Sequence, residues 1–376
     1  MKKNPPKPRL IVAASENDPD MLYATRFFAP DAFIFLEQNG RRTLVLSDLE
    51  IDRGRKQAAA DEILPYSAFE KEVQGKSAKA PAYEKVVAHF LMKRKVRSAV
   101  VPANFPLGLA REIESKKIRL QPTNGLFWPG RETKAEPELR LLRKALEITE
   151  AGMARGIEVL KRAKPGKAHK LEWSGAVLTS EILRAEIDTA VLRAGGLPAN
   201  TIVAGGDQAC DPHERGHGPL KANSLIIIDI FPRSAASGYY GDLTRTVVRG
   251  RASDEQRRLW ETVNEGQALA LKKMKPGVDG LKLHKEVKQF FTDRGYPTEV
   301  RHGRQTGFFH GTGHGLGLEI HEFPRFQKTV FKPGQVLTVE PGLYYPGLGG
   351  TRTEDVVVIT NRGIRMLSRC ENRLEL

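Results

Sequence analysis

The sequence predicts two domains, an α/β domain over residues 1–128 and a larger domain of strands and helices over residues 133–376. The 376 residues are enough to build two hydrophobic cores. Before residue 128, short apolar runs alternate with helix-like segments, whereas long helices separate β-branched runs after residue 133. The stretch Phe127-Trp128-Pro129-Gly130-Arg131 contains proline and glycine and is the expected linker.

Four apolar runs in the first domain have the length and composition of strands. They are Leu10–Ala14, Phe33–Leu36, Thr43–Leu46 and Ala99–Pro102. Between them, Tyr83–Lys95 has apolar residues at helical spacing and several basic residues, which predicts an amphipathic helix.

A long helix is predicted at the start of the second domain. Glu136 to Lys164 shows apolar residues at helical spacing, with acids early and bases late, as a helix dipole prefers. Two further helices are expected at Ser253–Lys273 and Gly280–Arg294. Strands are expected at residues 225–230, 238–248, 336–342 and 351–358.

The histidine segment, residues 310–322, reads His-Gly-Thr-Gly-His-Gly-Leu-Gly-Leu-Glu-Ile-His-Glu. It contains His310, His314 and His321, three of the chain's nine histidines. Glycine at such density indicates close approach of the backbone to a site, and imidazole is the commonest ligand for a divalent metal. A glycine-rich turn with core histidines is the alternative interpretation.

One acid interrupts or ends each of four strand-like runs. These acids are Asp229, Asp242, Glu340 and the pair Glu354-Asp355. An unpaired buried carboxylate is costly, and any one of these acids alone is also explained as a surface acid at a strand end. Their occurrence together, with the histidine segment between them, favours a metal site.

Two aspartates, two glutamates and one histidine suit a pair of divalent ions bridged by carboxylates. Two ions about 3.5–4 Å apart can activate one bridging water and polarise the bond that it attacks. Oxygen-rich ligation with one imidazole and no thiolate points to Mn²⁺, with Zn²⁺, Co²⁺ or Fe²⁺ as alternatives.

These residues resemble the motifs of the pita-bread metallopeptidases, which include Xaa-Pro aminopeptidases, Xaa-Pro dipeptidases (prolidases), methionine aminopeptidases and the metal-free creatinases. The resemblance covers the whole chain and is strongest over residues 200–360. It implies a creatinase-like α/β domain, followed by an α+β catalytic domain with a curved antiparallel sheet covered by helices. The family's five ligands match Asp229, Asp242, His314, Glu340 and Glu354.

The resemblance also implies roles for further residues. Pro212-His213 matches a pair whose histidine contacts substrate, but His213 lies one residue closer to the first aspartate than expected, and His217 is a rival. Arg352 matches an arginine that contacts a ligand, and His321 matches a histidine that steadies the reacting carbonyl.

Four more expectations follow from the resemblance. Glu340 is the expected proton shuttle, and His310 is expected to line the pocket around the proline ring. Arg325 matches an arginine that pairs with a dipeptide's carboxylate in prolidases. The gap between Asp229 and Asp242 is two residues longer than usual, and an enlarged hairpin would absorb it.

The predicted function is that of a dinuclear-metal aminopeptidase that cleaves before a proline in the second position of a peptide. Xaa-Pro dipeptidase is the alternative within the family. A non-catalytic pita-bread binding factor that uses a basic surface is the alternative from another class. The complete ligand set argues against the binding factor.

Charge and composition constrain the partners. The formal net charge is +15, but lysine and arginine are spread along the chain, so we do not expect nucleic-acid binding. The two cysteines are too few for a disulfide framework, and the basic start of the chain is followed by no long apolar stretch. We expect a cytoplasmic protein without membrane partners, and the resemblance implies a homodimer.

Overall fold

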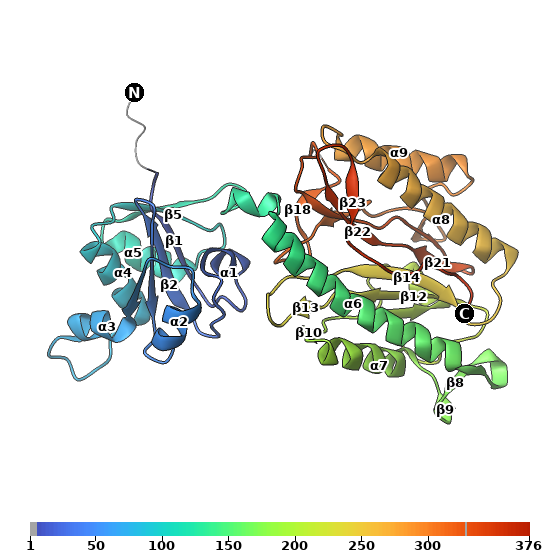
Figure 1. Ribbon diagram of the computed structural model, residues 1–376, viewed down its shortest axis with the longest axis horizontal. Coiled ribbons are helices and arrows are strands. Elements are labelled where there is room, and N and C mark those ends of the chain that lie inside the picture. Colours follow the sequence, from blue (N-terminus) through green and yellow to red (C-terminus); the bar gives the residue numbers. More distant parts are fainter. Residues whose placement is uncertain (1–5, 328) are drawn as a thin grey trace. The chain divides into compact units, whose positions relative to one another are not determined.

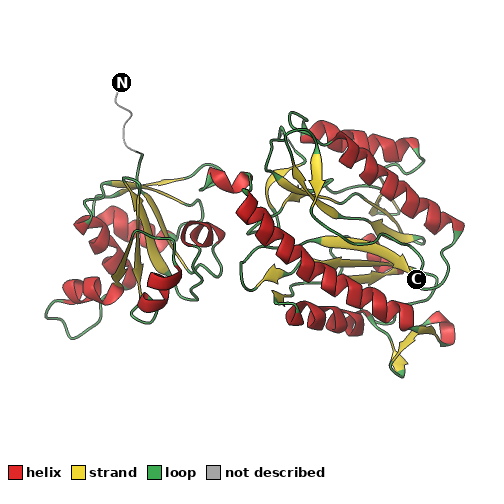
Figure 2. Cartoon of the chain, in the orientation of Figure 1, coloured by secondary structure: helices red, strands yellow, loops and turns green. Residues whose placement is uncertain are grey.

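The computed structural model describes residues 6–327 and 329–376. The chain divides into two compact units, Met1–Arg131 and Glu132–Leu376, and each is described by itself (Figure 1). Both units mix helices with strands (Figure 2). Within the described residues, no helix has both the length and the apolar composition needed to cross a membrane.

The first unit is built on a six-stranded sheet with the strand order β4-β3-β2-β1-β5-β6. The pairs β1·β5, β3·β4 and β5·β6 are parallel, and β2 is antiparallel to both of its neighbours. The strands are β1 (Arg9–Ala13), β2 (Phe33–Gln38), β3 (Arg41–Leu46), β4 (Glu62–Pro65), β5 (Ser98–Val101) and β6 (Arg119–Pro122). The helices are α1 (Pro19–Thr25), α2 (Ile51–Gln57), α3 (Tyr66–Gln74), α4 (Tyr83–Lys93) and α5 (Leu107–Ser115).

Helices cover both faces of this sheet. Successive strand residues point to opposite faces, so Leu10 and Val12 pack with α3, α4 and α5, whereas Ile11 packs with α1 and α2. The α/β prediction is confirmed, and each predicted element is present with its ends shifted by one or two residues. Six short elements were not predicted from the sequence: α1, α2, α3, α5, β4 and β6.

The second unit consists of antiparallel sheets covered by two pairs of helices (Figure 1). The helices are α6 (Glu136–Arg162), α7 (Ser180–Arg193), α8 (Asp254–Lys273) and α9 (Gly280–Asp293). One sheet contains β11 (Ile202–Gly205), β12 (Leu225–Ile230) and β14 (Leu243–Val248). A second contains β17 (His314–Gly315), β18 (Glu322–Arg325), β19 (Val336–Val339), β22 (Asp355–Ile359) and β23 (Ile364–Met366).

Short two- and three-stranded ladders complete the unit. They are formed by β20 (Gly342–Tyr345) with β21 (Gly349–Arg352), β10 (Gly196–Leu197) with β13 (Arg233–Ser234), β15 (Glu299–Arg301) with β16 (Arg304–Thr306), and β7 (Lys164–Pro165) with β8 (Leu171–Trp173) and β9 (Ala176–Val177).

The helices α6 and α7 cover the sheet of β11, β12 and β14. Ile226, Ile228 and Ile230 of β12 pack into the core that these helices share. Because side chains alternate along a strand, Asp229 is directed to the opposite face of the sheet. The expectation of an antiparallel sheet covered by helices is confirmed.

The helices α8 and α9 cover the five-stranded sheet in the same way. Leu337 and Val339 of β19 and Val357 of β22 pack against them. Alternation then places Thr338 and Glu340 on the face away from the helices. Asp229 of the first sheet and Glu340 of the second therefore both lie on the face that no helix covers.

Local sequence explains where the long helices begin and end. Ser253 and Gln256 form a reciprocal capping box at the start of α8, which satisfies backbone donors that a helix start leaves free. In α6, Glu136 and Glu138 lie in the first turn and Lys161 lies in the last, as the dipole favours.

Three of the predicted strand acids lie just outside the strands, which corrects the predicted boundaries. Asp242 precedes β14, Glu340 follows β19, and Glu354 lies between β21 and β22. Their backbones are held by other segments, because the N–H of Glu340 donates to Thr312 O at 2.8 Å and that of Glu354 to Thr244 O at 3.1 Å.

Glycines in the histidine segment allow close backbone packing. A Cβ atom at Gly313 would lie 2.0 Å from the carbonyl oxygen of Thr338, and one at Gly315 would lie 2.5 Å from the backbone of Phe323. At Gly311 the nearest atom would be 3.8 Å away. The segment carrying His314 therefore packs against β19 at a distance that only glycine permits.

Replacing Gly313 by alanine should destabilise the protein by about 1–3 kcal/mol, the usual cost of overpacking. The backbone of β19 must move because the added methyl group meets a carbonyl oxygen rather than a flexible side chain. Thermal unfolding followed by circular dichroism measures the effect, and Gly311→Ala is the matched control. Equal unfolding temperatures for the two variants would contradict the close-packing argument.

Candidate metal centre

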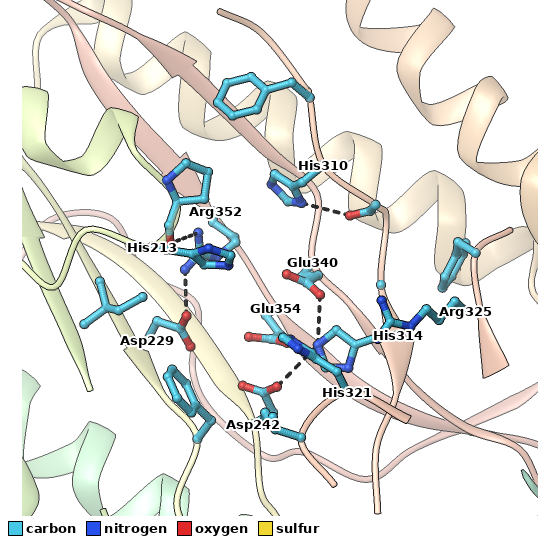
Figure 3. Close-up of a pocket in the computed structure, with 18 of the residues that line it drawn as sticks. His213, Asp229, Asp242, His310, His314, His321, Arg325, Glu340, Arg352 and Glu354 are labelled. Atoms are coloured by element: carbon cyan, nitrogen blue, oxygen red, sulfur yellow. Dashed lines mark hydrogen bonds and ion pairs between the residues drawn. The ribbon is translucent and has the colours of Figure 1, made fainter. Parts of the chain in front are cut away.

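The five predicted metal ligands come from five separate segments and line one cavity of about 640 Å³ (Figure 3). In Figure 3 their side chains point toward a common centre. They are Asp229 on β12, Asp242 before β14, His314 on β17, Glu340 after β19 and Glu354 before β22. Tertiary folding thus brings together all five residues that the sequence predicted.

Asp242, His314 and Glu354 form the centre of the group, because one ligand atom from each lies within 4.8 Å of the others. The Nε2 atom of His314 is 3.6 Å from Asp242 Oδ2 and 3.2 Å from Glu340 Oε1. Asp242 is only 4% exposed and Glu354 only 2%. Nitrogen and oxygen donors therefore converge in a space that water reaches poorly.

Asp229 has one occupied and one orphaned oxygen. Its Oδ2 atom accepts a hydrogen bond from the NH2 group of Arg352 at 2.7 Å. Its Oδ1 atom is buried and has no hydrogen-bond partner among the described residues. A buried acceptor without a partner costs free energy, and a bound cation would offset that cost.

The ring of His314 is oriented by its backbone surroundings. Nδ1 lies 3.1 Å from the carbonyl oxygen of Gly315, and the backbone N–H donates to Thr338 Oγ1 at 3.0 Å. Donation from Nδ1 leaves the lone pair on Nε2, the atom that faces the acids. Thr338 Oγ1 in turn donates to Glu340 Oε1 at 3.1 Å, so one hydroxyl aligns two candidate ligands.

Burial raises the pKa of Asp229, Asp242 and Glu354. Repulsion adds to the rise in pKa, chiefly from Glu354 on Asp242 and from Glu340 on Glu354. Burial also acts to raise the pKa of Glu340, but the hydrogen bond and charge of His314 outweigh it and lower that pKa to about 2. Anions crowded in this way favour the uptake of cations.

The donor set fits two divalent ions. Four carboxylates with one imidazole and no thiolate are ligands that Mn²⁺ and similar ions accept. The orphaned oxygen of Asp229 and the raised pKa values of three acids are both features that bound cations would relieve.

Two further histidines of the histidine segment line the cavity. The ring of His321 meets that of His314 edge-on, with centroids 4.4 Å apart. His310 Nε2 lies 2.8 Å from the hydroxyl of Tyr344, and its Nδ1 lies 2.9 Å from Gly311 O. Burial lowers the pKa of His310 and of His321 to about 4, so both are neutral at pH 7.

The structure separates the two rival histidines. His213 lines the cavity, whereas the side chain of His217 is 72% exposed and lies 3.6 Å from Glu214 Oε1. His217 is not among the residues that line the cavity. The position therefore favours His213 as the residue that meets substrate.

Arg352 and Tyr344 connect Asp229 to His310. The NH1 group of Arg352 donates to the Tyr344 hydroxyl at 3.1 Å, and this hydroxyl contacts His310. Burial raises the pKa of Tyr344 to about 12, so it remains a neutral donor. Tyr344 was not predicted from the sequence; its signal is the strand β20, which starts two residues after Glu340.

Arg325 lines the cavity with an exposed side chain. Among the described residues, its guanidinium makes no hydrogen bond or ion pair, unlike that of Arg352. It pairs through its backbone position with His314 across β17 and β18. A charged group is thus available at the wall of the cavity.

Other wall residues were not singled out from the sequence. They are Asn200, Ile202, Phe231, Phe309, Phe326 and Gln327. An apolar wall around a few polar groups is typical of a small-molecule pocket. These residues carry no local motif, and they come together only because separate segments converge.

Antiparallel sheets covered by paired helices, with a buried centre of carboxylates and imidazole, define a metal-dependent class of protein. The model of Metallopeptidase family M24 matches residues 140–361, more than half of the chain, so the chain belongs to this family. Membership confirms the resemblance to the pita-bread metallopeptidases.

Two Xaa-Pro dipeptidases are similar to this chain over much of its length. The Xaa-Pro dipeptidase of Pyrococcus horikoshii is 29% identical over 288 residues, which are 74% of this chain and 75% of that protein. The Xaa-Pro dipeptidase of Pyrococcus furiosus is 33% identical over 248 residues, 64% of each chain. The chain therefore matches just under two thirds of the length of this second relative.

Solved structures share the fold across nearly the whole chain. The X-Pro aminopeptidase from Thermotoga maritima has a TM-score of 0.82 at 24% identity and covers 98% of this chain and 97% of its own. The prolidase from Pyrococcus furiosus has a TM-score of 0.78 at 23% identity and covers 97% of both chains. At these identities the likeness shows the fold alone, and it confirms the predicted fold class.

Mn²⁺ should stabilise the protein more at about pH 8 than at about pH 5. In the metal-free protein, the raised pKa values of Asp229, Asp242 and Glu354 contribute stability below about pH 4, and this stability is lost as the pH rises through the folded-state pKa values. A cation offsets that loss but competes with protons at low pH.

The difference in unfolding temperature between Mn²⁺-loaded and chelator-treated protein measures this effect at each pH. An equal difference at the two pH values would contradict a site made of carboxylates.

Proposed function

We propose that this chain is an Xaa-Pro dipeptidase that uses two divalent ions. The observation that carries the proposal is Arg325, whose guanidinium lines the same cavity as the five candidate ligands and has no side-chain partner in the described part of the chain. The sequence analysis placed Xaa-Pro aminopeptidase first. The names of the two relatives support the reverse order.

Each ion would have its own set of ligands, and two carboxylates would serve both. One ion would be held by Asp229, Asp242 and Glu354, and the other by Asp242, His314, Glu340 and Glu354. When bound, the two ions would supply an activated water and polarise the peptide carbonyl. Mn²⁺ is the proposed metal, with Zn²⁺, Co²⁺ or Fe²⁺ as alternatives.

Glu340 is the proposed proton carrier. Its pKa is lowered to about 2, so it is a carboxylate at neutral pH and can accept a proton. The hydroxyl of Thr338 donates to one of its oxygen atoms, Oε1, at 3.1 Å. Its other oxygen can take a proton from the attacking water and deliver it to the leaving nitrogen of proline.

His321 and His213 are the proposed donors to the oxygen that becomes negative during the reaction. The pKa of His321 is lowered to about 4, so the ring is neutral and donates through one N–H. A donor placed in this way contributes roughly 3 kcal/mol to the stability of a transition state. His310, held by Tyr344, lines the part of the pocket that we assign to the proline ring.

Arg325 would recognise the carboxylate that ends a dipeptide. A planar guanidinium forms two parallel hydrogen bonds with a carboxylate. Such a contact favours substrates in which proline is the last residue, because a longer peptide places its carboxylate further out.

Xaa-Pro aminopeptidase activity is the second candidate. Arg325 and Gln327 are both exposed, so a longer peptide has a route out of the cavity past them. A non-catalytic binding factor is disfavoured, because such a factor has no need for five converging metal donors.

Asp242→Ala and Glu354→Ala should each lower peptidase activity by more than about 100-fold, since loss of an outer contact to a ligand alone costs 10–100-fold. Each residue is proposed to serve both ions, so bound Mn²⁺ should fall as well. Elemental analysis and release of free proline from Xaa-Pro measure the two effects. Full metal content with full activity in either variant would overturn the ligand assignment.

Arg325→Ala should lower kcat/KM for Xaa-Pro by roughly 30-fold, the loss of about 2 kcal/mol from a charged hydrogen bond. Cleavage of Xaa-Pro-Yaa should change little. Arg362→Ala, an exposed arginine that does not line the cavity, is the control. A wild-type preference for Xaa-Pro-Yaa with equal losses on both substrates would favour the aminopeptidase, and strong salt-dependent nucleic-acid binding without turnover would favour the binding factor.

A further inference from the structure

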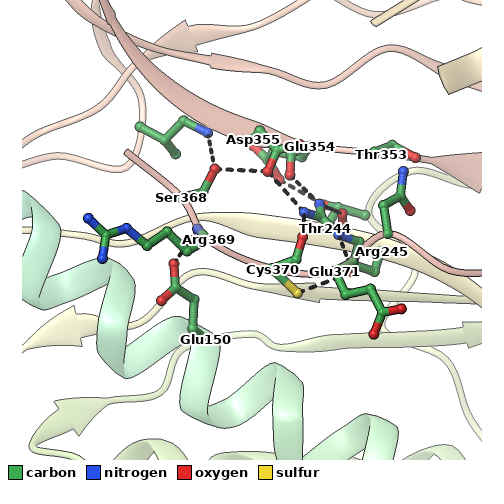
Figure 4. Close-up of polar contacts among 12 residues, drawn as sticks. Glu150, Thr244, Arg245, Thr353, Glu354, Asp355, Ser368, Arg369, Cys370 and Glu371 are labelled. Carbon is green, nitrogen blue, oxygen red and sulfur yellow. Dashed lines mark hydrogen bonds and ion pairs between the residues drawn. The ribbon is translucent and has the colours of Figure 1, made fainter. Parts of the chain in front are cut away.

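A buried polar network joins Arg245 of β14 to Asp355 of β22, next to the candidate ligand Glu354 (Figure 4). Its central cation is Arg245, which is 2% exposed and lies on β14 between Leu243 and Val247. Those two neighbours pack into the apolar core under α6 and α7. Burying an arginine in the core costs free energy unless each of its N–H groups has an acceptor. The acceptors of Arg245 therefore indicate its role.

Each N–H group of Arg245 has an acceptor. NH1 donates to Thr244 O at 2.9 Å and to Glu354 O at 2.6 Å. NH2 donates to Asp355 Oδ1 and to Cys370 O, both at 2.9 Å, and Nε donates to Glu371 O at 3.2 Å. The guanidinium thus holds the backbone of one candidate ligand, Glu354, directly.

Gln267 on α8 holds the backbone beside two candidate ligands. Its Nε2 group donates to the carbonyl oxygens of Val339 at 2.9 Å and Thr353 at 3.3 Å. These residues directly precede Glu340 and Glu354 in the chain. One amide therefore fixes the spacing of the two segments that present the glutamates to the cavity.

Asp355 joins the two holding residues. Its Oδ1 atom accepts from Arg245 and from Ser368 Oγ, the latter at 2.8 Å, and its Oδ2 atom accepts from Gln267 Nε2 at 3.1 Å. Alternation along the chain directs Asp355 toward α8 while Glu354 faces the cavity. The neighbouring acids Glu354 and Asp355 therefore have different roles: the first lines the cavity, and the second binds Arg245 and Gln267.

Stability alone does not explain this network. A buried ion pair such as that of Arg245 with Asp355 is often no more stabilising than apolar residues of the same volume. The hydrogen bonds of the network instead hold the backbone of Glu354, through Arg245, and of Val339 beside Glu340, through Gln267. Residues that hold metal ligands in place from behind commonly control metal affinity.

We propose that Arg245, Gln267 and Asp355 form a clamp that positions Glu340 and Glu354 for metal binding. The clamp rests on the proposed function, because it acts through the proposed dinuclear site. Its three members are positioning residues, since none of them lines the cavity. Loosening the clamp lets the two glutamates separate, so the ions bind more weakly and in altered geometry.

The test compares Gln267→Met and Arg245→Met with Arg249→Met. Arg249 lies four residues after Arg245, just past the end of β14, and also holds backbone carbonyls, those of Ala163 at 2.8 Å and Leu376 at 2.9 Å. Among the described residues, its side chain makes no hydrogen bond or ion pair with the segments of Glu340 and Glu354, so it reports the effect of losing an arginine that holds backbone elsewhere.

Three readouts separate positioning from simple stability. Calorimetric titration of chelator-treated protein with Mn²⁺ gives affinity and stoichiometry, the visible absorption of bound Co²⁺ reports coordination geometry, and thermal unfolding of the metal-free proteins reports stability. We expect Gln267→Met and Arg245→Met to bind Mn²⁺ about 10–100-fold more weakly, with a changed Co²⁺ spectrum. Arg249→Met should keep the wild-type Mn²⁺ affinity and Co²⁺ spectrum.

The outcomes are distinct. If Arg245→Met fails to fold, Gln267→Met still decides the question. It replaces the amide by an apolar group of similar size and leaves the ion pair of Arg245 with Asp355 intact. Folded Gln267→Met with the wild-type Mn²⁺ affinity and Co²⁺ spectrum would overturn the clamp while the proposed function stands. A wild-type protein that takes up no Mn²⁺ would overturn both.

Discussion

The burial of several carboxylates beside one another is the constraint on which the rest of the second unit depends. Asp229, Asp242 and Glu354 are all held where burial and repulsion raise their pKa values. Such a group persists only if cations, fixed donors or both offset the charge. Arg352 and the hydroxyls of Thr244 and Thr338 supply fixed donors, and a pair of divalent ions would neutralise the negative charge that remains.

The alternating directions of side chains along a strand allow the buried acids and the apolar core to lie on opposite faces of each sheet. On β12 and β19, apolar residues face the helix pairs while Asp229 and Thr338 face the cavity. Each sheet thus has one face that packs against helices and one face that contributes residues to the cavity. The network around Arg245 departs from this division, because it places polar groups on the apolar face, directly behind the segment that carries Glu354.

The question of substrate length depends on a different region from the metal centre. The metal donors explain hydrolysis but do not distinguish a dipeptide from a longer peptide. That distinction falls to the wall of the cavity, where Arg325 is exposed and His310 is held by Tyr344. A single guanidinium can therefore change specificity without altering the chemistry, as differences in binding energy at remote groups commonly do.

Local sequence determined much of this protein. Apolar periodicity predicted the long helices α6, α8 and α9 to within two residues at each end. Acids in apolar runs, together with the histidine segment, predicted a metal site, and the family resemblance selected the five ligands. Those signals are local, because the spacing of apolar residues that marks a helix or a strand is found within a short stretch of the chain. Short helices such as α1 and α2 were missed, since their few turns carry little periodic signal.

Only the tertiary structure decided which side chains face one another. Sequence could not choose between His213 and His217, nor show that Tyr344 links Arg352 to His310. It also could not show that Asp355 faces away from the cavity to which its neighbour belongs. These facts depend on contacts between segments separated by many residues, and packing of the whole unit sets them.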